Sequence, residues 1–145
     1  MPPHVTLVYP FADTELLGAA RFHELAEVIS RFAAFTYRLV ETARFRNAAS
    51  ILYLVPDPGE PFCALISALT DAFPEHPPYG GAHSEPIPHV TVADASDAKL
   101  NAIESEVAPW LPISARADAV SLMERGSSRA WRLRQQLPLA PMPTK

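Results

Sequence analysis

Cysteine is nearly absent from this sequence: Cys63 is the only one among 145 residues. A single thiol excludes an internal disulfide framework and favours a reducing, cytoplasmic compartment. Cys63 lies in the apolar stretch PFCALISAL, which is typical of a helix. We therefore expect it to be a small buried side chain rather than a nucleophile.

Long apolar runs and an excess of positive charge are also missing. No apolar run approaches the roughly 20 residues that span a bilayer, and the N-terminus does not read as a secretory signal. The 12 Lys and Arg residues against 16 Asp and Glu residues give a net charge of −4. This balance argues against a membrane partner and against wrapping of long nucleic acid, but it allows a small anionic substrate.

The chain has the length of one domain, and 48% of its residues are apolar, which is enough for a sizeable core. We expect a single domain over residues 1–138 and a flexible, extended tail at 139–145.

Apolar periodicity divides this domain into alternating strands and helices. The expected strands are 3–9, 35–45, 50–55, 88–93, 112–123 and 129–138, and the expected helices are 13–34, 60–73 and 96–110. Asp13 or Thr14 is the expected N-cap of the first helix, and Ser96 or Asp97 that of the third. The turn RGSSR joins the last two strands, and the Pro- and Gly-rich segment 74–88 is a loop.

The tripeptide His-Val-Thr occurs twice, each time after a proline, with His4 and Thr6 in one copy and His89 and Thr91 in the other. Each copy is followed by a helix and then two strands, which indicates an internal duplication. We therefore expect an α+β fold of two lobes, with two antiparallel sheets backed by helices around a central cleft.

Strand geometry gives each copy a polar face. Alternate side chains share a face, so the histidine and the threonine of one copy lie about 7 Å apart on one surface, with the valines in the core. If a pseudo-two-fold axis relates the halves, both polar faces meet across the cleft. A lone histidine on a strand is more often structural, but packing does not require one at both equivalent positions.

Two imidazoles and two hydroxyls suit phosphodiester chemistry without a metal or other cofactor. A neutral imidazole can remove a proton from the attacking oxygen while a protonated one gives a proton to the leaving oxygen. Thr6 and Thr91 can donate hydrogen bonds to the phosphoryl oxygens as charge develops.

The segments PPHVTLVYPF and IPHVTVADAS resemble the two H-x-T signatures of the 2H phosphoesterase superfamily, the group of the 2′-5′ RNA ligase-like proteins and cyclic phosphodiesterases. The resemblance extends to ILYLVPDPGEPFCALISALTDAFPEHPPYGG and to WRLRQQLPL, and so covers most of the chain. It implies a duplicated bilobal fold and metal-independent hydrolysis of 2′,3′-cyclic phosphate ends or related small cyclic nucleotides. By motif position, the catalytic set would be His4, Thr6, His89 and Thr91.

The chain departs from the family pattern at its front, where a strand and a helix precede the first motif in the family. Here only Met1, Pro2 and Pro3 stand before His4. We expect an uncovered sheet edge and apolar surface beside His4, possible homo-oligomerisation through it, and about 25–35 residues more in a longer reading frame. The alternative function is a non-catalytic module that binds a nucleotide or RNA end in a degenerate cleft.

Three further side chains are candidates for contact with the substrate. Tyr79 could stack on a base, while His83 and Arg132 could meet a phosphate, although solvated loop and strand residues are common. A zinc site of His83, His89 and Asp94 is conceivable, but these spacings match no recognised ligand pattern.

Overall fold

The protein is described by a computed structural model, in which residues 3–11, 17–46, 50–76, 87–126 and 130–143 can be described. The elements are α1 (Ala19–Ser30), β1 (Phe35–Arg46), β2 (Ser50–Asp57), α2 (Glu60–Ala72), β3 (Val90–Asp94), α3 (Asp97–Val107), the 3₁₀ turn η2 (Ala108–Trp110), β4 (Ile113–Ala117), β5 (Ala119–Arg125) and β6 (Trp131–Pro138). The strands form two antiparallel sheets, ordered β3-β2-β1-β4 and β5-β6. The α+β class with two antiparallel sheets and helices is confirmed.

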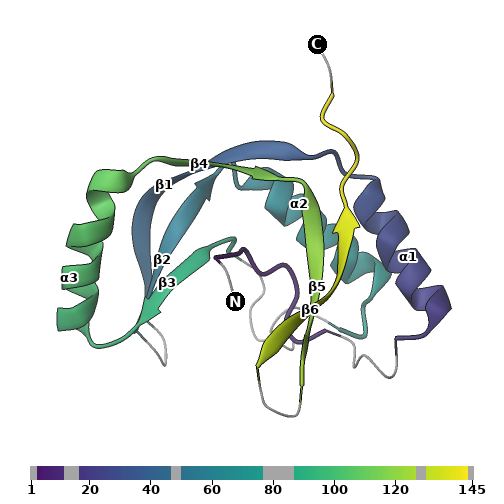
Figure 1. The fold of residues 1–145 in the computed structure, drawn as a ribbon, viewed down its shortest axis with the longest axis horizontal. Coiled ribbons are helices and arrows are strands. Elements are labelled where there is room, and N and C mark those ends of the chain that lie inside the picture. Colours follow the sequence, from purple (N-terminus) through teal and green to yellow (C-terminus); the bar gives the residue numbers. More distant parts are fainter. Residues whose placement is uncertain (1–2, 12–16, 47–49, 77–86, 127–129, 144–145) are drawn as a thin grey trace.

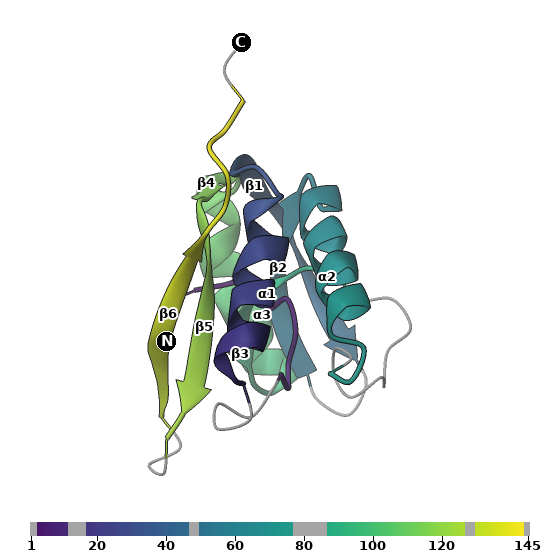
Figure 2. The same ribbon diagram turned by 90° about the vertical axis from the view of Figure 1, so that its right-hand side faces the viewer.

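The two sheets form an arch (Figure 1). Strand β4 leads into β5 with only Asp118 between them, so the chain turns from the larger sheet into the β5–β6 hairpin. Residues 3–11 run across the opening, between β3 and the hairpin. Helices α1 and α2 lie side by side next to the hairpin (Figure 2), and α3 lies at the opposite end of the arch. No described helix is long and apolar enough to cross a membrane.

Two apolar clusters hold this arrangement together. The larger one joins α1, α2 and the end of β6, and its buried residues are Leu25, Val28, Ile29, Ala34, Leu65, Leu69, Phe73, Leu137 and Leu139. The smaller one is built on Leu39, Leu54 and Val90, from β1, β2 and β3, with Val107 and Leu111 packed against it. The second cluster matters for the site because it buries the valine of a His-Val-Thr motif.

The first helix is shorter than the expected 13–34, and the C-terminal segment explains where it ends. Helix α1 begins after Gly18 and ends at Ser30, while Asp13 and Thr14 lie outside the described residues. The backbone of Ala140 donates to the Phe32 carbonyl at 2.8 Å and accepts from the Ala34 amide at 2.7 Å. These bonds take the chain out of helical geometry. Leu139, expected in the flexible tail, is instead buried in the larger cluster.

The predictions for the middle of the chain are confirmed within a few residues for β1, β2, α2 and α3. Ser96 is the N-cap of α3, and its hydroxyl accepts from the Lys99 amide at 3.4 Å. The expected single strand 112–123 is wrong, because it divides at Asp118 into β4, which pairs with β1, and β5, which pairs with β6. The Asp118 carbonyl accepts from the Leu139 amide at 2.9 Å, which fixes this corner.

Cys63 is exposed, so the expectation of a buried thiol is wrong. Helix α2 buries Phe62, Leu65, Ile66 and Leu69. Successive helical residues are about 100° apart, so Cys63 lies off this buried stripe although it directly follows Phe62.

Candidate functional site

The first His-Val-Thr copy is not the strand that was expected at 3–9. Within segment 3–11 the only ladder contact is an isolated antiparallel bridge between Val5 and Val90. Val5 packs against the smaller cluster, whereas Leu7 packs against the larger one. The segment therefore turns between these residues, because their side chains fill two different cores, and the regular alternation stops there.

The single bridge nevertheless aligns the two motifs. Antiparallel pairing of Val5 with Val90 sets His4 opposite Thr91 and Thr6 opposite His89. Residues in such opposite positions have Cα atoms about 4.5–5.5 Å apart, and their side chains share a face. Val5 and Val90 both belong to the smaller cluster. The bridge thus brings the backbones of the two motifs side by side.

The ring of His89 is held from two sides. Its Nδ1 lies 2.6 Å from the Ile87 carbonyl oxygen, and since a carbonyl only accepts, Nδ1 carries the hydrogen and donates it. This leaves Nε2 as the nitrogen that can exchange a proton. The rings of Phe45 and Tyr53 meet the imidazole at steep angles, with centroids at 4.9 and 5.5 Å.

Phe45 and Tyr53 are neighbours of His89 that sequence reasoning did not identify. They stack on each other at 4.2 Å between centroids, and Tyr53 pairs directly with Thr91 across β2 and β3. The expected strands 35–45 and 50–55 contain both residues, so an antiparallel pairing of these strands would have brought them together. Their contact with His89 depends on β3 being the next strand in the sheet, which periodicity does not reveal.

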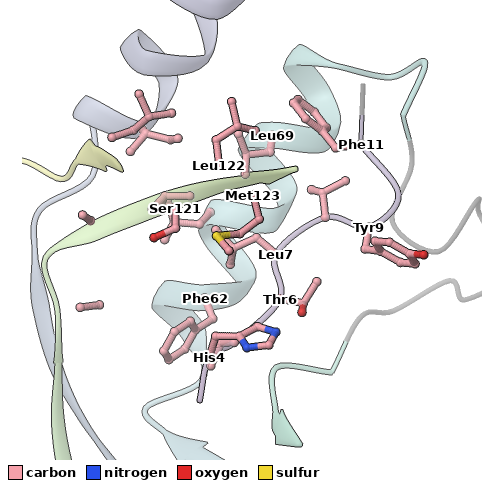
Figure 3. A pocket seen from close by; sticks show the side chains of 18 of the residues that line it. His4, Thr6, Leu7, Tyr9, Phe11, Phe62, Leu69, Ser121, Leu122 and Met123 are labelled. Carbon is pink, nitrogen blue, oxygen red and sulfur yellow. The ribbon is translucent and has the colours of Figure 1, made fainter. Parts of the chain in front are cut away.

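His4 and Thr6 project from segment 3–11 on the side away from Leu7 (Figure 3). His4 is exposed and Thr6 is half-buried. Both residues line a cavity of about 920 Å³ between this segment and β5, together with apolar side chains such as Phe62, Leu69 and Leu122. Phe62 and Leu69 are themselves buried, so the expected uncovered apolar surface beside His4 stays a prediction. His89 and Thr91 are not among the lining residues, so the cavity lies beside the paired motifs.

Arg132 lies outside this cavity's lining. Its Nε and one terminal nitrogen lie 2.8 and 2.7 Å from a carboxylate oxygen of Glu124, the residue opposite on β5. Tyr79 and His83 lie outside the described residues, so their places and that of the zinc alternative stay predictions. In the described ranges, no three His, Cys, Asp or Glu side chains are grouped to hold a metal.

A charged contact lies between α3 and the sheet that this helix supports. The Glu104 carboxylate accepts from the Thr42 hydroxyl at 2.6 Å and from the Arg44 guanidinium at 3.3 Å. The Thr42 hydrogen bond and the charge of Arg44 lower the pKa of Glu104, against an opposing effect of desolvation. These contacts fasten α3 to β1.

Two sequence comparisons relate this chain to known proteins. The sequence model of the 2'-5' RNA ligase superfamily matches residues 1–129. A protein of Bacillus pumilus (strain SAFR-032) named "Putative phosphoesterase" is 32% identical over 94 residues, which are 64% of this chain and 52% of the relative. The chain thus matches about half the length of this curated relative.

Proposed function

This chain belongs to the 2'-5' RNA ligase superfamily, and we propose that it is a phosphoesterase that opens 2′,3′-cyclic phosphates of RNA ends or small nucleotides. Family membership and the similar phosphoesterase support a phosphoesterase or ligase-like enzyme. The cyclic phosphate substrate and the two-histidine mechanism are our proposal.

In this mechanism, one imidazole takes a proton from water as the water oxygen bonds to phosphorus. The other imidazole gives a proton to the ribose oxygen whose bond to phosphorus breaks, and a phosphomonoester results. Nε2 of His89 is the nitrogen for one of these transfers, because Nδ1 donates to Ile87. Thr6 and Thr91 donate hydrogen bonds to the non-bridging oxygens, and no step requires a cofactor.

The observation that carries the proposal is the Val5–Val90 bridge. Acid–base catalysis of in-line displacement needs two proton-transfer groups on opposite sides of one phosphorus atom. The bridge supports this arrangement because it relates the two His-Val-Thr copies antiparallel, with each histidine opposite the other copy's threonine.

One observation favours the alternative of a non-catalytic module that binds a nucleotide or RNA end. In the described residues the backbone of segment 3–11 pairs with β3 through one isolated bridge, and His4 is exposed. Catalysis depends on close positioning, whereas binding tolerates a looser group. In this alternative, the protein would bind cyclic nucleotides without opening the ring.

The test is incubation of the purified protein with 2′,3′-cyclic mononucleotides in the presence of EDTA, followed by chromatography of the products. Our proposal predicts ring opening that survives chelation. Loss of turnover in EDTA and its recovery with zinc would contradict the mechanism. Saturable binding without any ring opening would establish the alternative.

A further inference from the structure

Two exposed aromatic rings meet at the edge of the cavity that contains His4. Tyr9 follows Thr6 by three residues, and its ring lies 5.9 Å from that of Trp131, at 69°. Tyr9 is 42% exposed and Trp131 is 37% exposed, whereas Phe62, Tyr53 and Phe73 are buried. Single exposed aromatic residues are common, but these two are in contact and line the same cavity as His4 and Thr6.

A cation completes this group. Arg125 pairs directly with Trp131 across the hairpin, and its guanidinium carbon lies 5.6 Å from the centre of the Trp131 ring. In the part of the chain that is described, Arg125 makes no ion pair with a carboxylate, whereas Arg132 is bound to Glu124. Arg125 is therefore the arginine of this hairpin that lies against the Trp131 ring and, among the described residues, carries no ion pair, so its charge can serve a ligand there.

Cross-strand pairing places Arg125 and Trp131 on one face of the hairpin. Val120 and Leu122 pack against the larger apolar cluster. The register of the hairpin shifts between Leu122 and Met123, and beyond this shift Arg125 pairs directly with Trp131, so these two side chains share a face. The aromatic pair therefore borders the same cavity as Leu65 and Leu69 of α2 while its own rings stay exposed.

We propose that Tyr9, Arg125 and Trp131 form a binding site for one nucleobase, beside the His4–Thr6 motif. The aromatic faces stack on the base, and the guanidinium adds a cation–π contact and attracts the phosphate. Stacking accepts any base, so the site favours nucleotides over base-free phosphodiesters without selecting a sequence. This inference rests on the proposed function for its ligand class, and it makes that substrate a nucleotide.

Tryptophan fluorescence tests binding without turnover. The chain has 2 tryptophans, and Trp110, which is 76% exposed in η2, lies outside the cavity lining. The variant Trp110→Phe therefore makes Trp131 the only tryptophan. We expect saturable quenching of Trp131 by adenosine 2′-monophosphate, a monoester that the proposed reaction cannot consume. Ribose 5-phosphate, which lacks the base, should give no saturable quenching at the same concentrations.

Variants in the Trp110→Phe background separate the site from its surroundings. Tyr9→Leu and Arg125→Gln should each weaken binding about 10-fold, the scale of one lost stacking or cation–π contact. Leu133→Ala is the matched control, because Leu133 is exposed on the same face of β6, two residues from Trp131. Three results would each contradict the base-binding site: equal quenching by adenosine 2′-monophosphate and ribose 5-phosphate, no saturable quenching, or unchanged affinity in both Tyr9→Leu and Arg125→Gln.

Kinetics then distinguish failure of this site from failure of the proposed function. With a cyclic nucleotide, Trp131→Leu should raise KM about 10-fold while Trp131→Phe stays near wild type, because phenylalanine keeps a π face. Equal kcat/KM for a nucleotide and a base-free cyclic phosphate would overturn the base site but leave the phosphoesterase. Binding of the base without ring opening would support the base-binding site and contradict the proposed phosphoesterase activity. Circular dichroism melting checks that each variant folds.

Discussion

Nδ1 of His89 donates a hydrogen bond to the carbonyl oxygen of Ile87 at 2.6 Å. This contact fixes which ring nitrogen faces away from the backbone. Phe45 and Tyr53 limit rotation of the same ring. His89 is therefore oriented by its surroundings before any substrate arrives, whereas His4 lies on a segment whose described backbone pairing with β3 is one isolated bridge.

The aromatic support of His89 gives the first prediction. Tyr53→Leu should lower kcat on a cyclic nucleotide by about 10-fold, because small misplacements of a catalytic group carry costs of that order or more. Tyr53→Phe keeps the ring and should stay near wild type. Nitrogen-15 spectra of the imidazole should show the Nδ1–H tautomer in wild type and a mixture in Tyr53→Leu. Identical spectra and rates in wild type, Tyr53→Leu and Tyr53→Phe would show that Tyr53 does not position His89.

The two threonines give the second prediction. Thr6→Val and Thr91→Val keep the shape but remove the hydroxyl, and each should lower kcat by about 10²–10³-fold, the usual effect of losing a donor to transition-state charge. Thr→Ser at the same positions should retain most of the rate. A rise in KM with unchanged kcat would contradict this role, because it would show that the hydroxyls bind the ground state and the transition state equally.

The contact between α3 and β1 gives the third prediction, on pH and stability. The pKa of Glu104 is lowered in the folded state, chiefly by Thr42, so its stabilisation is present above the unfolded pKa and is lost as pH falls through the folded pKa. Thr42→Val should therefore lower Tm at neutral pH, with a smaller difference from wild type near pH 3. Melting curves recorded from pH 3 to neutral pH measure this difference in Tm. Glu106→Gln, on the exposed side of α3, is the control.

A constant difference in Tm between Thr42→Val and wild type at every pH would contradict the ionic origin of this contact. Such a constant difference would indicate that the substitution changes packing around Thr42 rather than an ionic contact.

The outer edge of β5 gives the fourth prediction. In the described residues β5 pairs with β6 only, and its other side borders the apolar cavity. Unpaired edges and apolar surfaces favour association, so we expect reversible self-association that increases with concentration. Sedimentation velocity measures it. Met123→Lys places a charge in the cavity and should weaken association, whereas Ile113→Lys, at an exposed residue of β4, should not.

A single monomeric sedimentation coefficient at every concentration would contradict association through this edge. Equal effects of Met123→Lys and Ile113→Lys would place the contact elsewhere.

The sequence predicted those elements that bury one regular apolar face, such as α2 with Leu65 and Leu69. They failed where a distant partner decides the conformation. Segment 3–9 alternates like a strand, but Val5 and Leu7 pack into separate cores. The end of α1 and the division at Asp118 depend on backbone bonds to Leu139 and Ala140, about 20 residues or more along the chain in each case.

The candidate site was predictable in composition but not in arrangement. The repeated tripeptide predicts His4, Thr6, His89 and Thr91 as the site, and this assignment stays a prediction, whereas the packing of Val5 and Val90 in the smaller cluster is shown. The antiparallel pairing of the two copies could not be read from either copy alone. Neither could the aromatic contacts of His89, because they require the strand order β3-β2-β1.

The central claim is that His4 and His89 act on one phosphorus atom as a catalytic unit. Its most direct test is the rate of cyclic nucleotide opening in His4→Ala, His89→Ala and the double variant, with His23→Ala, on the exposed side of α1, as the control. Each single variant should lose about 10²–10⁴-fold. The double variant should lose about as much as the slower single variant, because groups that act together are not additive. A wild-type rate in either single variant would contradict the claim.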